Sequence, residues 1–323
     1  MSTVKTTVHD PLDFEVLADG LGFPEGPCIA EDGTVYAVDI DLTTIVKADG
    51  KGGATIVATP GGGPNGMALR ADGTAIVANN GGFLWSEVGG TRIPIDPETH
   101  TSEPPGFEKG WIEQVDLTTG DVSRLHDSCN GRTFRGPNDL VFDEVGGLWF
   151  TDLGKGRHAS VDRGGLYYLP PDGGEVHEIA FPLLGPNGVG LSPDGRTVYA
   201  AETHTGRLWS WALAEPGVVR PDAGSLAIRH GGVCLASTPF SFDSLAVEED
   251  GRIAIGAIVD GIVVITPDGR EIDVHPIPGD ITTNIAFGGS GRRRAVLSLS
   301  RSGRLVDAVW PRPGLALNVP SSG

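Results

Sequence analysis

The chain has 323 residues, of which 49 are glycine, 24 are proline and 39% are apolar. This apolar content is that of a globular protein, whereas disordered chains carry fewer apolar groups. The frequent glycines and prolines, and the short apolar stretches between them, exclude long helices. The formal net charge of −18 opposes binding to nucleic acid or to an anionic membrane surface, because both would repel the chain at long range.

The cysteines and the N-terminal segment bear on the expected compartment. Cys28, Cys129 and Cys234 are far apart, and none belongs to a Cys-x-x-Cys pair, so we expect free thiols in a reducing environment. Residues 1–13 are polar and lack the apolar segment of a signal peptide, and no apolar run is long enough to cross a bilayer. The sequence therefore predicts a cytoplasmic protein.

Six copies of one pattern follow each other along the chain. Each copy has a polar residue, a short strand, a turn and a second strand. The six openings are Pro24-Glu25-Gly26, Pro64-Asn65-Gly66, Pro137-Asn138-Asp139, Pro186-Asn187-Gly188, Phe242-Asp243-Ser244 and Thr283-Asn284-Ile285. In four copies the polar residue lies seven positions before the Asp of an Asp-Gly pair, which favours a tight hairpin. We call the six polar residues the anchors.

The spacing of the anchors predicts the fold. Successive anchors are 40 to 73 residues apart, which suits blades of four antiparallel strands. We therefore expect an all-β protein in which residues 1–323 form one six-bladed β-propeller around a central channel. The first blade is expected to be completed by a strand from elsewhere in the chain, with residues 305–310 or 14–17 as candidates.

Blade two contains a long insertion, residues 81–111, that has several aromatic residues and prolines and no clear strand pattern. Two interpretations remain open. The insertion is either a lid over the mouth of the channel or a structural loop packed on the outside.

Because the first strand of each propeller blade follows the central axis, the anchors are expected to converge in a ring. The ring would hold two carboxylates, from Glu25 and Asp243, and four carboxamides, from Asn65, Asn138, Asn187 and Asn284. Two carboxylates that face each other in a partly desolvated channel repel unless a cation lies between them. Oxygen ligands suit a hard divalent ion, so Ca²⁺ is the first expectation, with Mg²⁺, Mn²⁺ and Zn²⁺ as alternatives.

On these residues the chain resembles the regucalcin, gluconolactonase and luciferin-regenerating-enzyme family of six-bladed propellers. The most specific segments are Pro24-Glu25-Gly26-Pro27, Gly136-Pro137-Asn138-Asp139 and Gly185-Pro186-Asn187-Gly188. The resemblance implies that Glu25, Asn138, Asn187 and Asp243 are metal ligands and that Asp243 is also the catalytic base. It further implies a hydrolase that opens a sugar lactone or another small lactone.

The chain departs from this family at positions that concern the substrate. Asn65 stands where a glycine is common, His204 stands where a small polar residue is more usual, and the insertion in blade two is long. Candidate substrate contacts are Asn65, Arg135, His204 and Asn284, and Lys155 is a further candidate at the channel mouth. For Arg135 and His204, a surface ion pair or an ordinary loop position is the alternative.

Two other functions remain open on the same ring. One is a hydrolase of the phosphotriesterase type, and the other is a propeller that binds a ligand without catalysis. The pattern Gly-x-Gly-x-x-Gly at residues 61–66 leads into a strand, not a helix, so it does not indicate a dinucleotide site. The chain contains no His-Glu-x-x-His and no Gly-x-Ser-x-Gly motif, which disfavours zinc proteases and serine hydrolases.

Overall fold

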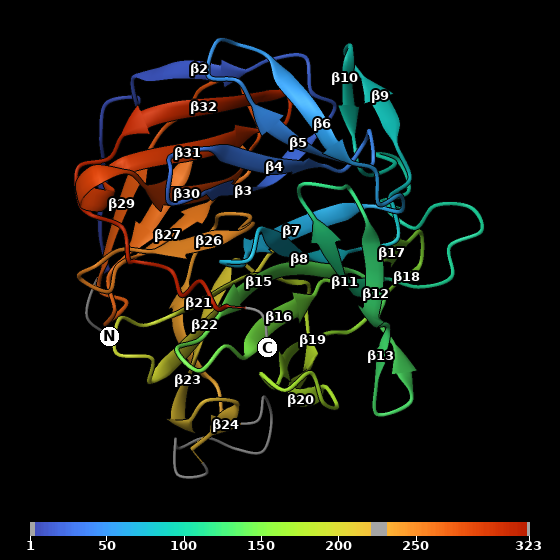
Figure 1. Ribbon diagram of the computed structural model, residues 1–323. Coiled ribbons are helices and arrows are strands. Elements are labelled where there is room, and N and C mark those ends of the chain that lie inside the picture. The colour runs from blue at the N-terminus through green and yellow to red at the C-terminus, as the bar shows by residue number, and fades with distance from the viewer. Residues whose placement is uncertain (1–3, 221–230, 322–323) are drawn as a thin grey trace.

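The computed structural model describes residues 4–220 and 231–321, and within them it is built of strands with one 3₁₀ helix, η1 (Ser290–Arg292). Six sheets follow one another around a central axis, as Figure 1 shows from the blue first blade to the red last blade. The predicted six-bladed propeller is confirmed. No helix in the described ranges combines the length and the hydrophobicity that a membrane crossing requires.

Each blade has four antiparallel strands that run outward from the axis in chain order, except that blade six takes its outermost strand from near the N-terminus. Blade one is β3 (Pro24–Ile29), β4 (Val35–Asp39), β5 (Thr44–Ala48) and β6 (Ala54–Ala58). Blade two is β7 (Pro64–Leu69), β8 (Thr74–Asn79), β11 (Trp111–Asp116) and β12 (Val122–His126). Blade three is β15 (Pro137–Phe142), β16 (Leu148–Asp152), β19 (Gly164–Leu169) and β20 (His177–Leu183).

The second half of the chain repeats this plan with additions at the outer edges. Blade four is β21 (Pro186–Leu191), β22 (Thr197–Glu202), β23 (Arg207–Glu215) and β25 (Val233–Ser237), with β24 (Val218–Val219) also paired to β23. Blade five is β26 (Leu245–Val247), β27 (Ile253–Gly256), β28 (Ile262–Ile265) and β29 (Glu271–His275). Blade six is β30 (Thr282–Gly288), β31 (Arg294–Leu299), β32 (Arg304–Val309) and β2 (Phe14–Ala18).

Three short hairpins project from this plan. They are β9 (Ser86–Val88) with β10 (Thr91–Ile93), β13 (Ser128–Cys129) with β14 (Arg132–Thr133), and β17 (Gly156–Arg157) with β18 (Ser160–Val161). The β9–β10 hairpin belongs to the insertion in blade two. The β17–β18 hairpin connects β16 to β19 in blade three.

The ring closes differently from the expectation. Blade one supplies all four of its own strands, so it borrows none. Instead β2, near the N-terminus, pairs antiparallel with β32 and completes blade six, and Figure 1 shows blue β2 beside red β32. The prediction that a strand from 305–310 or 14–17 completes blade one was therefore wrong: the strand at 14–17 is used, but at the outer edge of the last blade.

The inner strands form a closed circle in which β3, β7, β15, β21, β26, β30 and again β3 contact one another in turn. Between each pair of neighbouring blades lies one hydrophobic cluster, and together the six clusters form the core. The cluster between blades one and two, for example, joins Phe23 and Val38 to Met67 and Val77. Each blade is therefore stabilised by both of its neighbours, and the burial of apolar area between blades holds the ring together.

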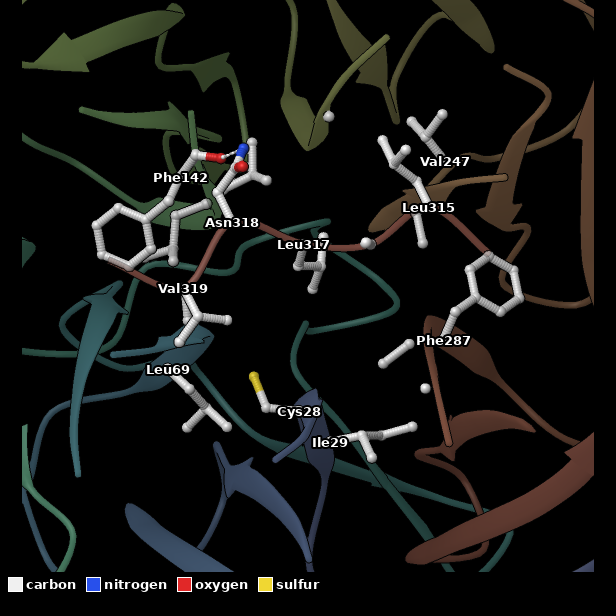
Figure 2. Close-up of a pocket in the computed structure, with 18 of the residues that line it drawn as sticks. Cys28, Ile29, Leu69, Phe142, Val247, Phe287, Leu315, Leu317, Asn318 and Val319 are labelled. Carbon is white, nitrogen blue, oxygen red and sulfur yellow. Dashed lines mark hydrogen bonds between the residues drawn. The ribbon is translucent and has the colours of Figure 1, made fainter. Parts of the chain in front are cut away.

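The far end of the channel, where the Asp-Gly hairpins lie, is crossed by the C-terminal segment. Leu315 N donates to Val247 O (2.8 Å) in blade five, Asn318 Nδ2 to Phe142 O (3.1 Å) in blade three, and Ala71 N in blade two to Pro320 O (3.0 Å). Figure 2 shows this segment across the opening, with Leu315 and Leu317 over it. A cavity of about 1430 Å³ extends from this segment to the underside of the anchor ring. The repeat pattern carries no sign of this segment.

An additional strand near the N-terminus, β1 (Lys5–Val8), pairs parallel with β29 at the outer edge of blade five. Just beyond it, the rings of His9 and His275 stack with centroids 4.5 Å apart, and His275 also packs against Trp310 at 4.7 Å. Burial is the main cause that lowers the pKa of His275 to about 4; the neighbouring charges of His9 and Arg312 act in the same direction, and Asp273 opposes them. Protonation of His275 therefore weakens this edge.

We predict an acid-dependent loss of stability from His275. Between pH 6.5 and 4, His275 binds a proton in the unfolded chain but not in the folded protein. The free energy of unfolding therefore falls as the pH decreases through this window. Urea unfolding at pH 7 and pH 4.5 should show that His275→Phe removes roughly 1–3 kcal/mol of the wild-type difference between the two pH values. The exposed His158→Phe is the control. An equal pH dependence in wild type and His275→Phe would contradict the prediction.

Candidate active site

The anchors lie together at the end of the channel opposite the C-terminal segment. Five of them are the second or third residue of an inner strand, whereas Asp243 directly precedes β26 because that strand is shorter. Five are buried in the channel wall: Glu25, Asn65, Asn138, Asn187 and Asn284. Asp243 alone of the six is partly exposed. The described structure thus brings together the residues that the repeat pattern selected.

The inner strands approach so closely at this level that a side chain would not fit between them. A Cβ atom on Gly26 would lie 2.6 Å from the carbonyl oxygen of Asn65, and one on Gly188 would lie 2.7 Å from that of Asp243. Gly188 N also donates to Asp243 O at 3.1 Å. Glycine after the anchor therefore permits the close approach that makes neighbouring anchors adjacent in space.

The two carboxylates of the ring interact unfavourably. Burial raises the pKa of Glu25, and hydrogen bonds from Asn284 and Gly26 offset part of this. Burial also raises the pKa of Asp243 well above its usual range, and the negative charge of Glu25 raises it further. With no counter-charge between them, the two groups disfavour simultaneous ionisation.

Some oxygen atoms of the ring point where no described protein group meets them. Glu25 Oε2 accepts from Asn284 Nδ2 (2.8 Å) and from Gly26 N (2.5 Å), but its second oxygen, Oε1, is buried without a hydrogen-bond partner. Asn138 Oδ1 is also buried without one. Buried polar atoms normally have partners, so these two oxygens indicate a position for a ligand.

The donor set fits a hard divalent cation. Two carboxylates balance two positive charges, and the amide oxygens add neutral ligands of the kind that Ca²⁺ accepts. Within the described part of the chain, no group of three or more His, Cys, Asp or Glu side chains could hold a metal ion. A cation at the ring would therefore depend on asparagine oxygens in addition to Glu25 and Asp243.

One acidic residue next to the ring was not singled out from the sequence. Asp139 follows Asn138 and is buried, and its carboxylate accepts from Val189 N (2.9 Å) and Leu140 N (2.9 Å). Burial raises the pKa of Asp139 to about 7. A signal was available, because the residue after the anchor is glycine in blades one, two and four but aspartate in blade three.

The other predicted contacts occupy different surroundings. His204 lies in the exposed β22–β23 connection against Gly185, two residues before Asn187. Arg135 lies near the start of β15 and donates to Asp162 Oδ2 (3.0 Å), Glu103 Oε2 (2.6 Å) and Glu108 O (3.0 Å). The role of both residues in substrate binding stays a prediction.

Lys155 is enclosed by the insertion in blade two. Its side chain is buried, Nζ donates to Gly82 O at 2.6 Å, and the ammonium lies 3.8 Å from the centroid of the Phe83 ring. Burial lowers the pKa of Lys155 to about 7. We therefore infer that Lys155 holds the insertion in place.

Comparisons with known proteins identify relatives of this chain. The sequence profile described as SMP-30/Gluconolactonase/LRE-like region matches residues 23–301. A gluconolactonase of Zymomonas mobilis is 25% identical over 304 residues, which cover 86% of this chain and 76% of the relative. The lactonase drp35 of Staphylococcus saprophyticus is 31% identical over 149 residues, which cover 44% of this chain and 42% of the relative.

Solved structures show the same fold. A calcium-binding protein, regucalcin, from Agrobacterium tumefaciens has a TM-score of 0.72 at 20% identity and covers 98% of this chain and 99% of its own. A luciferin-regenerating enzyme has a TM-score of 0.71 at 16% identity and covers 96% of this chain and 100% of its own. At these identities the likeness shows the fold alone.

The strain between the carboxylates predicts that neutralising one of them stabilises the metal-free protein. In Glu25→Gln, the side-chain oxygen can still accept from Asn284 Nδ2, and one of the two ring charges is removed. With chelator at pH 8 the melting temperature should rise by about 2–6 °C. Because the raised pKa values make the carboxylates cost stability as the pH increases, the gain should shrink toward pH 5.

Thermal unfolding followed by circular dichroism measures this effect. The exposed Glu31→Gln serves as the matched control, since it removes a carboxylate outside the ring. A lower melting temperature for metal-free Glu25→Gln than for wild type would show that the two ring carboxylates do not oppose each other.

Proposed function

This chain belongs to the SMP-30/Gluconolactonase/LRE-like family, and from that membership we propose that it is a lactonase that depends on a divalent metal ion. The observation that carries the proposal is the pair of unpartnered buried oxygens, Glu25 Oε1 and Asn138 Oδ1, beside a second carboxylate. The curated relatives are named gluconolactonase and lactonase. The names of these relatives suggest the reaction class, and the anchor ring offers the candidate metal ligands and the general base.

The residues that would hold the ion are Glu25, Asn138, Asn187 and Asp243. Ca²⁺ suits this oxygen donor set best, and Mg²⁺, Mn²⁺ or Zn²⁺ are the alternatives. When bound, such an ion polarises the lactone carbonyl and stabilises the oxyanion that develops on hydrolysis.

Asp243 is the residue that we assign as general base. It is the one anchor residue that is not fully buried, and its raised pKa favours acceptance of a proton. Water adds to the lactone carbonyl carbon as Asp243 accepts its proton, the ring C–O bond then breaks, and the proton passes to the departing alkoxide. The product is the open-chain hydroxy acid, and Asp243 returns to its ionised form.

The remaining polar residues position the reacting groups. Asn284 holds Glu25 Oε2 through its Nδ2 atom (2.8 Å), and Ser244 Oγ donates to Asn187 Oδ1 (3.4 Å), so two of the proposed ligands are oriented by neighbouring blades. We propose that Asn65, Asn284, Arg135 and His204 contact the substrate.

The proposal predicts that Asp243→Asn lowers kcat/KM for δ-lactones at least about 100-fold, because it removes the base and a charged ligand together. Glu25→Gln should cause a similar loss and weaken Ca²⁺ binding at least about 10-fold. A pH-indicator assay with added Ca²⁺ measures hydrolysis, and isothermal titration measures binding.

Asp260→Asn, in the β27–β28 connection at the same end of the propeller, is the control and should leave both quantities unchanged. Wild-type rates in both ring variants would refute the assignment of the site. Hydrolysis of a phosphotriester in preference to every lactone in the panel would replace the lactonase proposal with the alternative hydrolase. Ca²⁺ binding without turnover of either class would favour a ligand-binding propeller.

A further inference from the structure

The insertion in blade two begins next to the anchor ring. Asn80 N donates to Gly63 O at 2.8 Å, two residues before Asn65. Five residues further along, the ring of Trp85 packs against Phe23 with centroids 5.4 Å apart, and Phe23 lies two residues before Glu25. Residues 80–85 therefore lie beside the first residues of β3 and β7, at the end of the channel where the anchors are.

This segment brings two aromatic side chains, Phe83 and Trp85, to the anchor end of the channel. A cation lies over each ring: Lys155 Nζ is 3.8 Å from the centroid of Phe83, and the guanidinium of Arg92 is 5.5 Å from that of Trp85. Phe83 meets Trp85 edge to face with centroids 6.4 Å apart, and both residues stay partly exposed. Ile281, three residues before Asn284, packs against the same cluster. The mouth thus has an aromatic and aliphatic wall beside blades six, one and two, which consists of Phe83, Trp85 and Ile281.

This wall is held in place by polar contacts to blade three. Lys155 Nζ bonds to Gly82 O beside Phe83, and Ser102 N donates to Gly156 O at 2.9 Å. Glu103 binds Arg135 (2.6 Å) and Arg157 (2.5 Å). Since the segment is fixed on both sides, it presents a preformed surface, and binding to such a surface costs little ordering entropy.

The wall is poorly suited to a polyhydroxylated ring. Of its three side chains, just the indole N–H of Trp85 can form a hydrogen bond. A sugar lactone has a hydroxyl on nearly every ring carbon, and a hydroxyl that loses water without gaining a partner weakens binding. An alkyl or aryl substituent, in contrast, gains from contact with partly exposed aromatic rings.

We propose that the substrate is a lactone with an apolar substituent and that Phe83, Trp85 and Ile281 bind this substituent. This inference rests on the lactonase function proposed above. The anchor ring acts on the ester group and the wall recognises the substituent. The insertion is thereby a fixed specificity element at the mouth of the channel, and the lactone enters with its apolar group toward blades one and two.

The test compares δ-decalactone, which carries a five-carbon chain, with unsubstituted δ-valerolactone and with glucono-δ-lactone, all with Ca²⁺ present. For wild type, kcat/KM should be at least roughly 10-fold higher for δ-decalactone than for either of the others. In Trp85→Ala the ratio of δ-decalactone to δ-valerolactone should fall about 10-fold. Trp85→Phe should retain most of the ratio because it keeps an apolar ring at the wall.

Two further variants support the comparison. Ile281→Ser should lower the same ratio, and it keeps the test available if Trp85→Ala does not fold. Phe14→Ala removes a ring that is 40% exposed on the outer strand of blade six and should leave the ratio unchanged. A wild-type preference for glucono-δ-lactone, or an unchanged ratio in Trp85→Ala and Ile281→Ser, would overturn the inference while leaving the lactonase proposal intact.

A binding measurement tests the role of the wall independently of the lactonase proposal. If wild type hydrolyses none of the three lactones, the lactonase proposal fails. The corresponding δ-lactams, with and without the five-carbon chain, still report on the wall by isothermal titration. Tighter binding of the substituted lactam that is lost in Trp85→Ala supports the wall, and equal affinity for the two lactams overturns it.

Discussion

The repulsion between Glu25 and Asp243 is the constraint on which the rest of this site depends. Both carboxylates reach the axis because the inner strands form a closed circle, and both resist ionisation there because the channel wall excludes water. A protein that only needed a stable channel would gain by replacing them with neutral residues. The divalent cation that we propose at the centre of the blades would account for their presence and for the two unpartnered oxygens beside them.

The fold was predictable because one hairpin plan occurs six times. A strand that starts at an anchor and turns at Asp-Gly can bury its apolar face only against neighbouring copies, so the repeat alone points to a propeller. The closure was mispredicted because the strand at residues 14–17 has the same short β pattern wherever it pairs. Its place beside β32 is decided by the shape of the completed ring, which no local pattern encodes.

The site was predictable to a similar extent. The six anchors were found from their register, and the described structure gathers them at one end of the channel. The role of Asp139 was not predicted because its carboxylate accepts from Val189 N of blade four, a contact that depends on how the blades pack. The aromatic residues of the insertion were noted in the sequence, but their packing beside blades one and two was not predicted. The C-terminal segment across the far opening was missed, since it does not belong to the repeat.

The two ends of the channel differ in structure: one holds the anchor ring, and the other is crossed by the C-terminal segment. The C-terminal segment crosses the far end through contacts with blades two, three and five, and the cavity behind it reaches Gly26 and Asn284 at the level of the ring. The most direct test is a crystal structure of the protein with Mn²⁺, whose anomalous scattering locates the ion. The account predicts one strong peak among the side-chain oxygens of Glu25, Asn138, Asn187 and Asp243. A fully occupied ion elsewhere, with the ring filled by water alone, would contradict it.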